Sequence, residues 1–249
     1  MPLHSTDAIV IGGHDLSEAD RIVVFYTQAG GKVRAVADGA RRLRSRFGGS
    51  LQLFSHGRLV YFERPNRTLH KVNEFGVARS HHLLREDLDR MLLASAAVEA
   101  VALGVEEGEA APDLFRLLAE ALDLLEVSPR PALVMQGYTL HLLRLLGFLP
   151  ELAECVRCRA ALAAAPDACL SPSQGGLVCG RCRTAVSDAI AGSAAALGFL
   201  RGASASTLRL IDRISLAPQT LQQVTDILQA FLRQALGRSL RSQDVQARL

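Results

Sequence analysis

The chain of 249 residues contains no tryptophan, and only 5% of its residues are aromatic. Long apolar runs are also missing, since the most apolar segment, residues 91–105, is interrupted by Glu99. A membrane-spanning helix is therefore not expected, because it needs about 20 predominantly apolar residues. The first ten residues lack the basic segment and long apolar run of a secretory signal. These absences predict a soluble, cytoplasmic protein.

Sequence motifs of catalysis are equally scarce. The glycine pairs at 12–13 and 30–31 fit neither common phosphate-binding glycine motif, and we interpret them as turns. The 7 histidines are scattered and form no H-x-x-x-H pair. Glu86, Asp87 and Asp89 are typical of a solvated face at the start of a helix. The sequence predicts a protein that is not an enzyme, and the alternative is a metal-dependent nuclease built on these three carboxylates.

Four of the 5 cysteines form two close pairs, Cys155-Val-Arg-Cys158 and Cys179-Gly-Arg-Cys182. A two-residue gap lets two thiolates on one tight turn point at a single ion, and two such turns supply four sulfur ligands. Four thiolates leave no open position for catalysis, so the pattern predicts one structural Zn²⁺. Two disulfides or a redox C-x-x-C motif are the alternatives. Cys169, between the pairs, is expected to be a small apolar residue.

Charge is unevenly distributed along the chain, although the net charge is only +3. Residues 1–79 contain 12 Lys and Arg against 7 Asp and Glu, and residues 150–249 contain 11 against 7. The segment between them is acidic, with 5 against 11. Two basic regions of this kind favour contact with a polyanion, most often nucleic acid. The alternative for the basic regions is ordinary surface charge. A further alternative is a protein-interaction scaffold whose function lies in the acidic middle region.

The first 79 residues read as short β-strands. β-Branched and aromatic runs are separated by glycine-rich turns, and a longer loop spans residues 39–49. In the third run, alternation places Lys32 and Arg34 on one face of the strand. Five short strands predict a small barrel, with the OB-fold as the leading candidate. The expected strands are Asp7–Ile11, Arg21–Thr27, Lys32–Ala37, Arg58–Glu63 and Leu69–Val77.

The apolar period becomes helical from residue 80 onward. The chain is therefore predicted to be an α+β protein of two domains. These are an OB-fold nucleic-acid-binding domain over 1–79 and a helical domain over 80–249, with a zinc knuckle inserted at about 150–185. Proline suits the first turn of a helix and glycine its end. The expected helices begin near residue 83 and then span residues 112–127, 131–147, 188–201 and 218–236.

The loop between the third and fourth expected strands is rich in arginine. Arg41, Arg42, Arg44 and Arg46 lie within six residues and are followed by Phe47. Each guanidinium could neutralise one phosphate, and Phe47 either stacks on a base or, as we favour, is buried in the barrel. We expect the four arginines, with Lys32 and Arg34 on the neighbouring strand, to bind DNA. The alternative is a solvated loop without a ligand.

A set of short segments along the chain forms an ordered pattern. Besides the two cysteine pairs, the segments are Ala8–Ile11, Glu18–Arg21, Gly31-Lys32, Gly39–Arg41, Ser45–Gly49, Leu146–Glu151, Ser171-Pro172, Gly175–Cys179 and Ser239–Ser242. Taken in order, they resemble the bacterial RecO recombination mediators. The likeness covers most of the chain, and the ordered set is more specific than any one motif. Where the family often has an aromatic residue, this chain has Cys169-Leu170.

The resemblance implies an N-terminal OB-fold and a C-terminal helical domain that holds zinc in many members. It implies a protein of DNA repair and recombination that binds single- and double-stranded DNA and anneals complementary strands. It also implies two protein partners, RecR and the single-stranded-DNA-binding protein, with which recombinase is loaded onto DNA gaps. Such a protein would be cytoplasmic and associated with the nucleoid.

Overall fold

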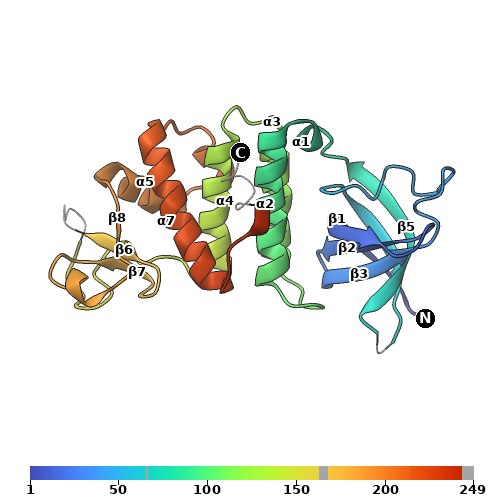
Figure 1. The fold of residues 1–249 in the computed structure, drawn as a ribbon, viewed down its shortest axis with the longest axis horizontal. Helices are drawn as coiled ribbons and strands as arrows, with labels where there is room; N and C mark the ends of the chain where they lie inside the picture. Colours follow the sequence, from blue (N-terminus) through green and yellow to red (C-terminus); the bar gives the residue numbers. More distant parts are fainter. Residues whose placement is uncertain (66, 163–167, 243–249) are drawn as a thin grey trace. The chain divides into compact units, whose positions relative to one another are not determined.

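A computed structural model describes residues 1–65, 67–162 and 168–242 (Figure 1). The chain divides into two compact units, Met1–Glu126 and Val127–Leu249. The first unit contains a five-stranded barrel and helices, and the second contains helices, a small sheet and the turns that hold the cysteine pairs. The expected fold class is confirmed, since a barrel is followed by helices with a cysteine module among them. The boundary between the two units lies within the helical part of the chain.

The barrel is closed by strands in the order β1-β2-β3-β5-β4, with β4 pairing back to β1. The β3–β5 pair is parallel and the other pairs are antiparallel. This is the OB-like barrel that the sequence predicts. β2 has the expected bounds, and the others differ by a few residues at their ends. The strands are β1 (Leu3–Asp15), β2 (Arg21–Thr27), β3 (Gly31–Ala37), β4 (His56–Phe62) and β5 (Leu69–Arg79).

The barrel interior is filled by alternate residues of its strands and by two side chains of the long loop. Successive side chains of a strand point to opposite faces, so Phe25 of β2 and Val33 of β3 face inward and are buried. Phe47 and Leu51 join the same cluster, and Phe47 is only 6% exposed. Burial of Phe47, favoured over base stacking, is therefore confirmed. The loop is fastened to the core at this point.

Three helices follow the barrel within the first unit: α1 (Leu83–Glu86), α2 (Leu88–Gly104) and α3 (Pro112–Val127). One helix was expected from residue 83, but Asp87 divides it in two. The Asp87 carboxylate accepts the backbone N–H of Arg90 at 3.0 Å and so caps the start of α2. α3 has the predicted bounds. Its Phe115 ring contacts Tyr26 of β2, with 6.0 Å between ring centroids.

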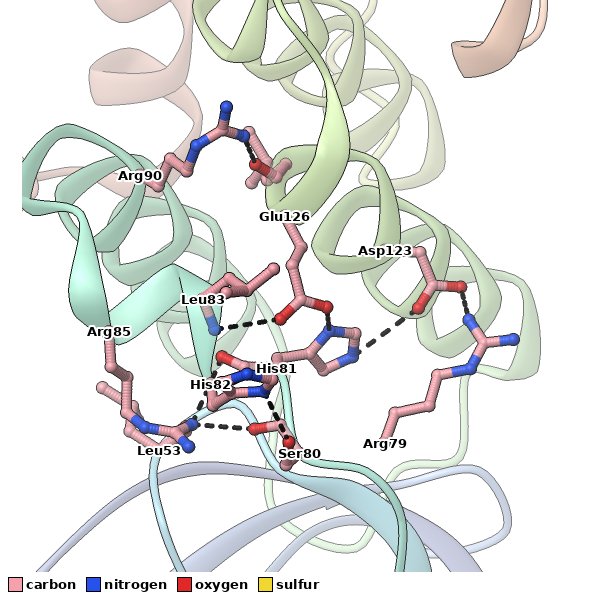
Figure 2. A network of polar contacts seen from close by, with 11 residues as sticks. Leu53, Arg79, Ser80, His81, His82, Leu83, Arg85, Arg90, Asp123 and Glu126 are labelled. Carbon is pink, nitrogen blue, oxygen red and sulfur yellow. Dashed lines mark hydrogen bonds and ion pairs between the residues drawn. The ribbon is translucent and has the colours of Figure 1, made fainter.

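A buried histidine joins the end of β5 to α3 (Figure 2). His81 is 2% exposed, and its Nδ1 donates to the Glu126 carboxylate at 3.0 Å. The same carboxylate accepts the backbone N–H of Leu83 at 3.1 Å, at the start of α1. Asp123 lies 3.6 Å from the other ring nitrogen of His81 and pairs with Arg79 of β5. The network fixes the turn from barrel to helices onto α3.

The second unit is built around α4, which packs against the three helices that follow it. α7 has the predicted bounds and ends at Gly237, whose φ of 68° is left-handed, as expected for a glycine C-cap. No helix in the described part of the chain is both long and apolar enough to cross a membrane. The helices are α4 (Pro131–Leu145), α5 (Ala194–Ser204), α6 (Leu208–Ile211) and α7 (Pro218–Leu236).

A three-stranded sheet, in the order β7-β6-β8, lies between α4 and α5 in the sequence. The sequence predicted a helix over 188–201, and this is wrong for its first residues. Residues 190–191 form a strand because they pair with β6, and α5 begins only after Ser193, whose hydroxyl accepts the N–H of Ala196. The strands are β6 (Cys169–Ser171), β7 (Gly176–Val178) and β8 (Ile190–Ala191).

Candidate metal centre and arginine loop

The four paired cysteines converge on one point. Their Sγ atoms all lie within 4.8 Å of one another, and those of Cys158 and Cys179 are 3.7 Å apart. A tetrahedral site with Zn–S bonds of about 2.3 Å places its sulfurs about 3.8 Å apart, so the cluster has the size of a four-sulfur metal site. All five cysteines are free thiols, which does not fit the two-disulfide alternative. The group could hold one metal ion.

A tight turn presents the first pair. The N–H of Cys155 donates to the carbonyl of Ala160 at 2.8 Å, and the N–H of Arg159 donates to the carbonyl of Cys155 at 2.9 Å. Arg159 has a left-handed φ of 61°, which reverses the chain directly after Cys158. The turn therefore brings both sulfurs to the same side of the backbone.

The second pair lies on a turn directly after β7. The N–H groups of Cys182 and Arg183 both donate to the carbonyl of Cys179 at 3.0 Å. The N–H of Cys179 points at the Cys155 sulfur, 3.4 Å away. Backbone N–H groups directed at a thiolate favour its charged form. The two turns thus supply both the sulfur atoms and part of their electrostatic stabilisation.

The thiols affect one another's ionisation. Burial opposes ionisation of Cys155, but backbone N–H donors, Cys179 first, outweigh it and lower its pKa to about 6. The pKa of Cys182 is raised to about 12, chiefly by its hydrogen bond to the Cys179 thiol. Four thiolates so close together need a cation between them. The donor set therefore fits a soft divalent metal ion.

Cys169 lies outside this cluster. It is 1% exposed, and its Sγ is 3.6 Å from the carbonyl of Val178. Burial raises the pKa of its thiol, which keeps it neutral. It is a small buried residue of β6, as its isolated position in the sequence indicates.

The arginine loop, defined as residues 39–49, is anchored at its start by Asp20. The Asp20 carboxylate accepts the N–H of Gly39 at 2.8 Å, and this hydrogen bond is the main cause of its lowered pKa. The N–H of Arg41 donates to the carbonyl of Ala19 at 3.0 Å. Sequence reasoning did not single out Asp20. Its signal is the Ser17-x-x-Asp20 turn before β2, where the Ser17 hydroxyl donates to the carboxylate.

All four arginines of the loop are exposed, but they differ in their partners. Arg41 pairs with Asp15 at 3.2 Å and donates to the carbonyl of Ser17 at 2.7 Å. In the described part of the chain, the side chains of Arg42 and Arg44 make no ion pair or hydrogen bond. The charges of these two guanidiniums are therefore available to a ligand.

Arg46, at the end of the loop, faces the barrel. One of its guanidinium nitrogens donates to the carbonyl of Val72 at 3.3 Å. Its central carbon also lies 4.8 Å from the centroid of the Phe47 ring, a cation–π contact. The buried phenylalanine thus positions the neighbouring cation instead of stacking on a base.

A shallow groove of about 490 Å³ runs beside the loop. Three of its cations come from the loop and one, Lys71, comes from β5 and pairs with Asp38 at 2.8 Å. The groove is large enough for a phosphate and the adjoining sugar, and most of its charged groups are positive. Its lining includes Asp38, Arg42, Arg44, Arg46, Lys71 and Asn73.

The structure does not bring Lys32 to the arginine loop. Its ammonium donates to the carbonyls of Ala102 and Val105, at 2.9 and 3.3 Å, where α2 ends. A cation stabilises the negative end of a helix, so Lys32 holds the barrel to α2. Arg34 lies on the same outer face of β3 and is partly exposed. The predicted alternation, with Lys32 and Arg34 on one face of β3, agrees with the structure. On that face, however, Lys32 contacts α2 within the same unit.

The carboxylates of the nuclease alternative are not gathered into a site. Asp87 caps α2, and Glu86 and Asp89 are exposed. Among the described residues, the four paired cysteines are the only group of three or more His, Cys, Asp or Glu that could hold a metal ion.

Protein-family models match both parts of the chain. A model described as "Recombination protein O N terminal" matches residues 1–81, and one described as "Recombination protein O C terminal" matches residues 85–244. The chain belongs to the RecO family. The RecO resemblance of the sequence is thereby confirmed, and with it a place among proteins of DNA repair and recombination.

Curated relatives agree over nearly the whole length. The protein from Desulfitobacterium hafniense is 32% identical over 252 residues, covering 100% of this chain and 91% of the relative. That from Roseiflexus is 35% identical over 240 residues, covering 96% and 83%. That from Symbiobacterium thermophilum is 33% identical over 246 residues, covering 98% and 96%. Each is named DNA repair protein RecO.

Proposed function

We propose that this RecO-family chain is a mediator of DNA repair that binds single- and double-stranded DNA through its arginine loop. In this proposal it catalyses no reaction. The observation that carries the proposal is the exposed, unpaired pair Arg42 and Arg44 beside a cationic groove on an OB-like barrel. Arg41 and Arg46 flank this pair, and Arg34, partly exposed on the outer face of β3, is kept as a further candidate contact. Lys32 is left out because its donors are used within the unit.

The mechanism is electrostatic. Guanidiniums that neutralise phosphates release condensed counterions, which gives sequence-independent affinity. Two complementary strands held in this way repel each other less and pair faster. We therefore expect the chain to promote annealing. We assign DNA contact to residues 1–79 and structural support, with protein partners, to residues 80–249.

The proposed partners follow from the family. The relatives are named as DNA repair proteins, and the resemblance of the sequence implies RecR and the single-stranded-DNA-binding protein. Acting with RecR, the chain would help to load recombinase onto DNA covered by the single-stranded-DNA-binding protein. This role places it with DNA in the cytoplasm, at the nucleoid.

We assign the four-cysteine cluster to one structural Zn²⁺. Cys155, Cys158, Cys179 and Cys182 would hold the ion, and four sulfur ligands leave it no open position for substrate. Bound zinc would cross-link the two turns that carry the cysteine pairs. The sheet next to the two turns has three short strands, so metal binding would contribute much of the folding energy of this module.

The test is a binding and annealing assay on the intact chain and on a variant with Arg41, Arg42, Arg44 and Arg46 replaced by Ala. We expect the variant to bind labelled oligonucleotides less tightly, with a weaker salt dependence, and to anneal them more slowly. A control on the other unit, Arg233→Ala with Arg238→Ala, removes two exposed cations. Equal binding by all three proteins would contradict the proposal.

The same assay addresses the alternatives. Added Mg²⁺ or Mn²⁺ with labelled DNA gives cleavage if the chain is a nuclease, and annealing without cleavage if it is a mediator. Capture of protein partners from DNase-treated lysate, without DNA affinity of the pure chain, would favour an interaction scaffold. No observation on the described residues favours either alternative, and zinc content measured on the same preparation tests the metal assignment.

A further inference from the structure

The tip of the arginine loop exposes a leucine completely. Leu43 has an exposed fraction of 105%, the highest among the large apolar residues of the described chain. Its neighbours on both sides are the unpaired arginines Arg42 and Arg44. Exposed single leucines are common, but this one lies between two cations on a loop that is fixed at both ends. Packing within the chain does not account for it.

Local hydrogen bonds hold the tip in place. The N–H of Arg42 donates to the carbonyl of Gly39 at 3.1 Å, and that of Ser45 donates to the carbonyl of Arg42 at 3.0 Å. The second of these turns encloses Leu43, and the first comes directly before it. With Asp20 fixing one end of the loop and Phe47 the other, the leucine is presented outward with little freedom to fold back.

We propose that Leu43 inserts between neighbouring bases of a DNA strand whose phosphates are held by Arg42 and Arg44. This inference rests on the proposed DNA-binding function. Apolar side chains inserted between base steps are a known means of unstacking DNA, and a phosphate on each side of the inserted step would meet an arginine. The loop then makes two separable contacts, a cationic one with the backbone and an apolar one with the bases.

Charge complementarity favours DNA over a lipid surface as the occupant. An anionic membrane would also attract the arginines, but stable interfacial binding needs an extended apolar face. Leu43 is the one large apolar side chain exposed at the tip, because Phe47 is buried. A single base step offers an apolar slot that matches one leucine. The wedge also gives the loop a preference for strands that are already unpaired, because these cost less to unstack.

The experiment compares the intact chain with Leu43→Ala, and with Leu88→Ala as a control that truncates a half-exposed leucine of the same unit. The probe is a short single-stranded oligonucleotide carrying 2-aminopurine, whose fluorescence rises when its base is unstacked. Its affinity is measured by titration at several salt concentrations. A parallel titration uses vesicles of phosphatidylcholine and phosphatidylglycerol.

We expect Leu43→Ala to reduce affinity about tenfold and to abolish the fluorescence rise. The substitution removes about three carbon atoms, which the inserted leucine would bury only partly between the bases. Its salt slope should equal that of the intact chain, since no phosphate contact is removed. Leu88→Ala should behave like the intact chain.

Three outcomes overturn the inference. If Leu43→Ala binds and unstacks like the intact chain, Leu43 is not a wedge, although the proposed DNA binding stands. If the intact chain itself does not bind the oligonucleotide, the proposed function fails first. If vesicles bind the intact chain more tightly than DNA does, and Leu43→Ala loses that binding, the tip is a lipid anchor.

Discussion

The four loop arginines should not contribute equally to DNA affinity. Arg42 and Arg44 have no side-chain ion pair or hydrogen bond in the described chain, whereas Arg41 is paired with Asp15 and Arg46 donates to a backbone carbonyl. An arginine that must give up an internal partner gains less from a phosphate than one that has none. We therefore predict that the inner pair, Arg42 and Arg44, contributes more to the electrostatic part of DNA affinity than the outer pair, Arg41 and Arg46.

The size of the effect follows from counterion release. Each phosphate contact with a single strand contributes about 0.7 to the slope of log affinity against log salt. Replacing Arg42 and Arg44 by Ala should thus lower the slope by about 1.4 and reduce affinity about 25-fold at 0.1 M salt. Replacing Arg41 and Arg46 should change the slope by less than about 0.7. The second double variant should instead lose a little stability, up to about 1 kcal/mol for an exposed ion pair.

The assay is fluorescence anisotropy of a labelled oligonucleotide over a series of salt concentrations, with urea unfolding of each variant alongside. Arg233→Ala with Arg238→Ala again provides the matched control, since it removes the same charge from the second unit. The reasoning is refuted if the outer pair changes the slope as much as the inner pair. It is equally refuted if the control changes the slope as much as either.

Three further predictions concern stability and metal. Cys158→Ser should lose stoichiometric zinc on elemental analysis whereas Cys169→Ser retains it, and equal zinc in both would contradict the ligand set. Glu126→Ala should destabilise the first unit by about 2–3 kcal/mol in urea, because the N–H groups of His81 and Leu83 lose their acceptor, and Glu126→Gln should cost about half as much. Burial lowers the pKa of His141 in the folded chain, so the unfolded chain takes up a proton at this side chain first as the pH falls below about 6.5. The free energy of unfolding is therefore expected to decrease below that pH. His141→Gln should flatten this acid dependence of unfolding, and an unchanged pH profile would count against it.

Elements bounded by strong local signals were predictable from the sequence. β2 combines β-branched and aromatic residues and is followed by Gly30-Gly31, so its bounds agree with the structure. α3 and α7 begin at prolines, which fix the backbone at a first helical position, and α7 ends at a glycine that adopts the required left-handed φ. The cysteine spacing likewise located the cluster of four sulfurs that could hold a metal ion, because two short turns suffice to present them.

Elements that depend on distant pairing were missed. Ile190 lies in an alanine-rich segment with good helix propensity, yet it forms a strand because it pairs with Leu170, twenty residues away in the sequence. Lys32 was placed on the correct face of β3, but its partners lie about 70 residues further along, where α2 ends. Asp20 looks like an ordinary turn residue until the chain brings Gly39 against it. Local patterns do not encode such contacts.

The arginine loop shows how a folded scaffold can present groups that folding itself does not use. Phe47 contributes apolar burial at one end of the loop, and Asp20 contributes hydrogen bonds at the other. Between these anchors, the tip gains little from the chain, because Leu43 is fully exposed and Arg42 has only a long-range attraction to Asp20. Local inconsistency of this kind is expected where a residue serves a ligand. Because the anchors already order the tip when the chain folds, the tip loses less conformational entropy when it binds a ligand.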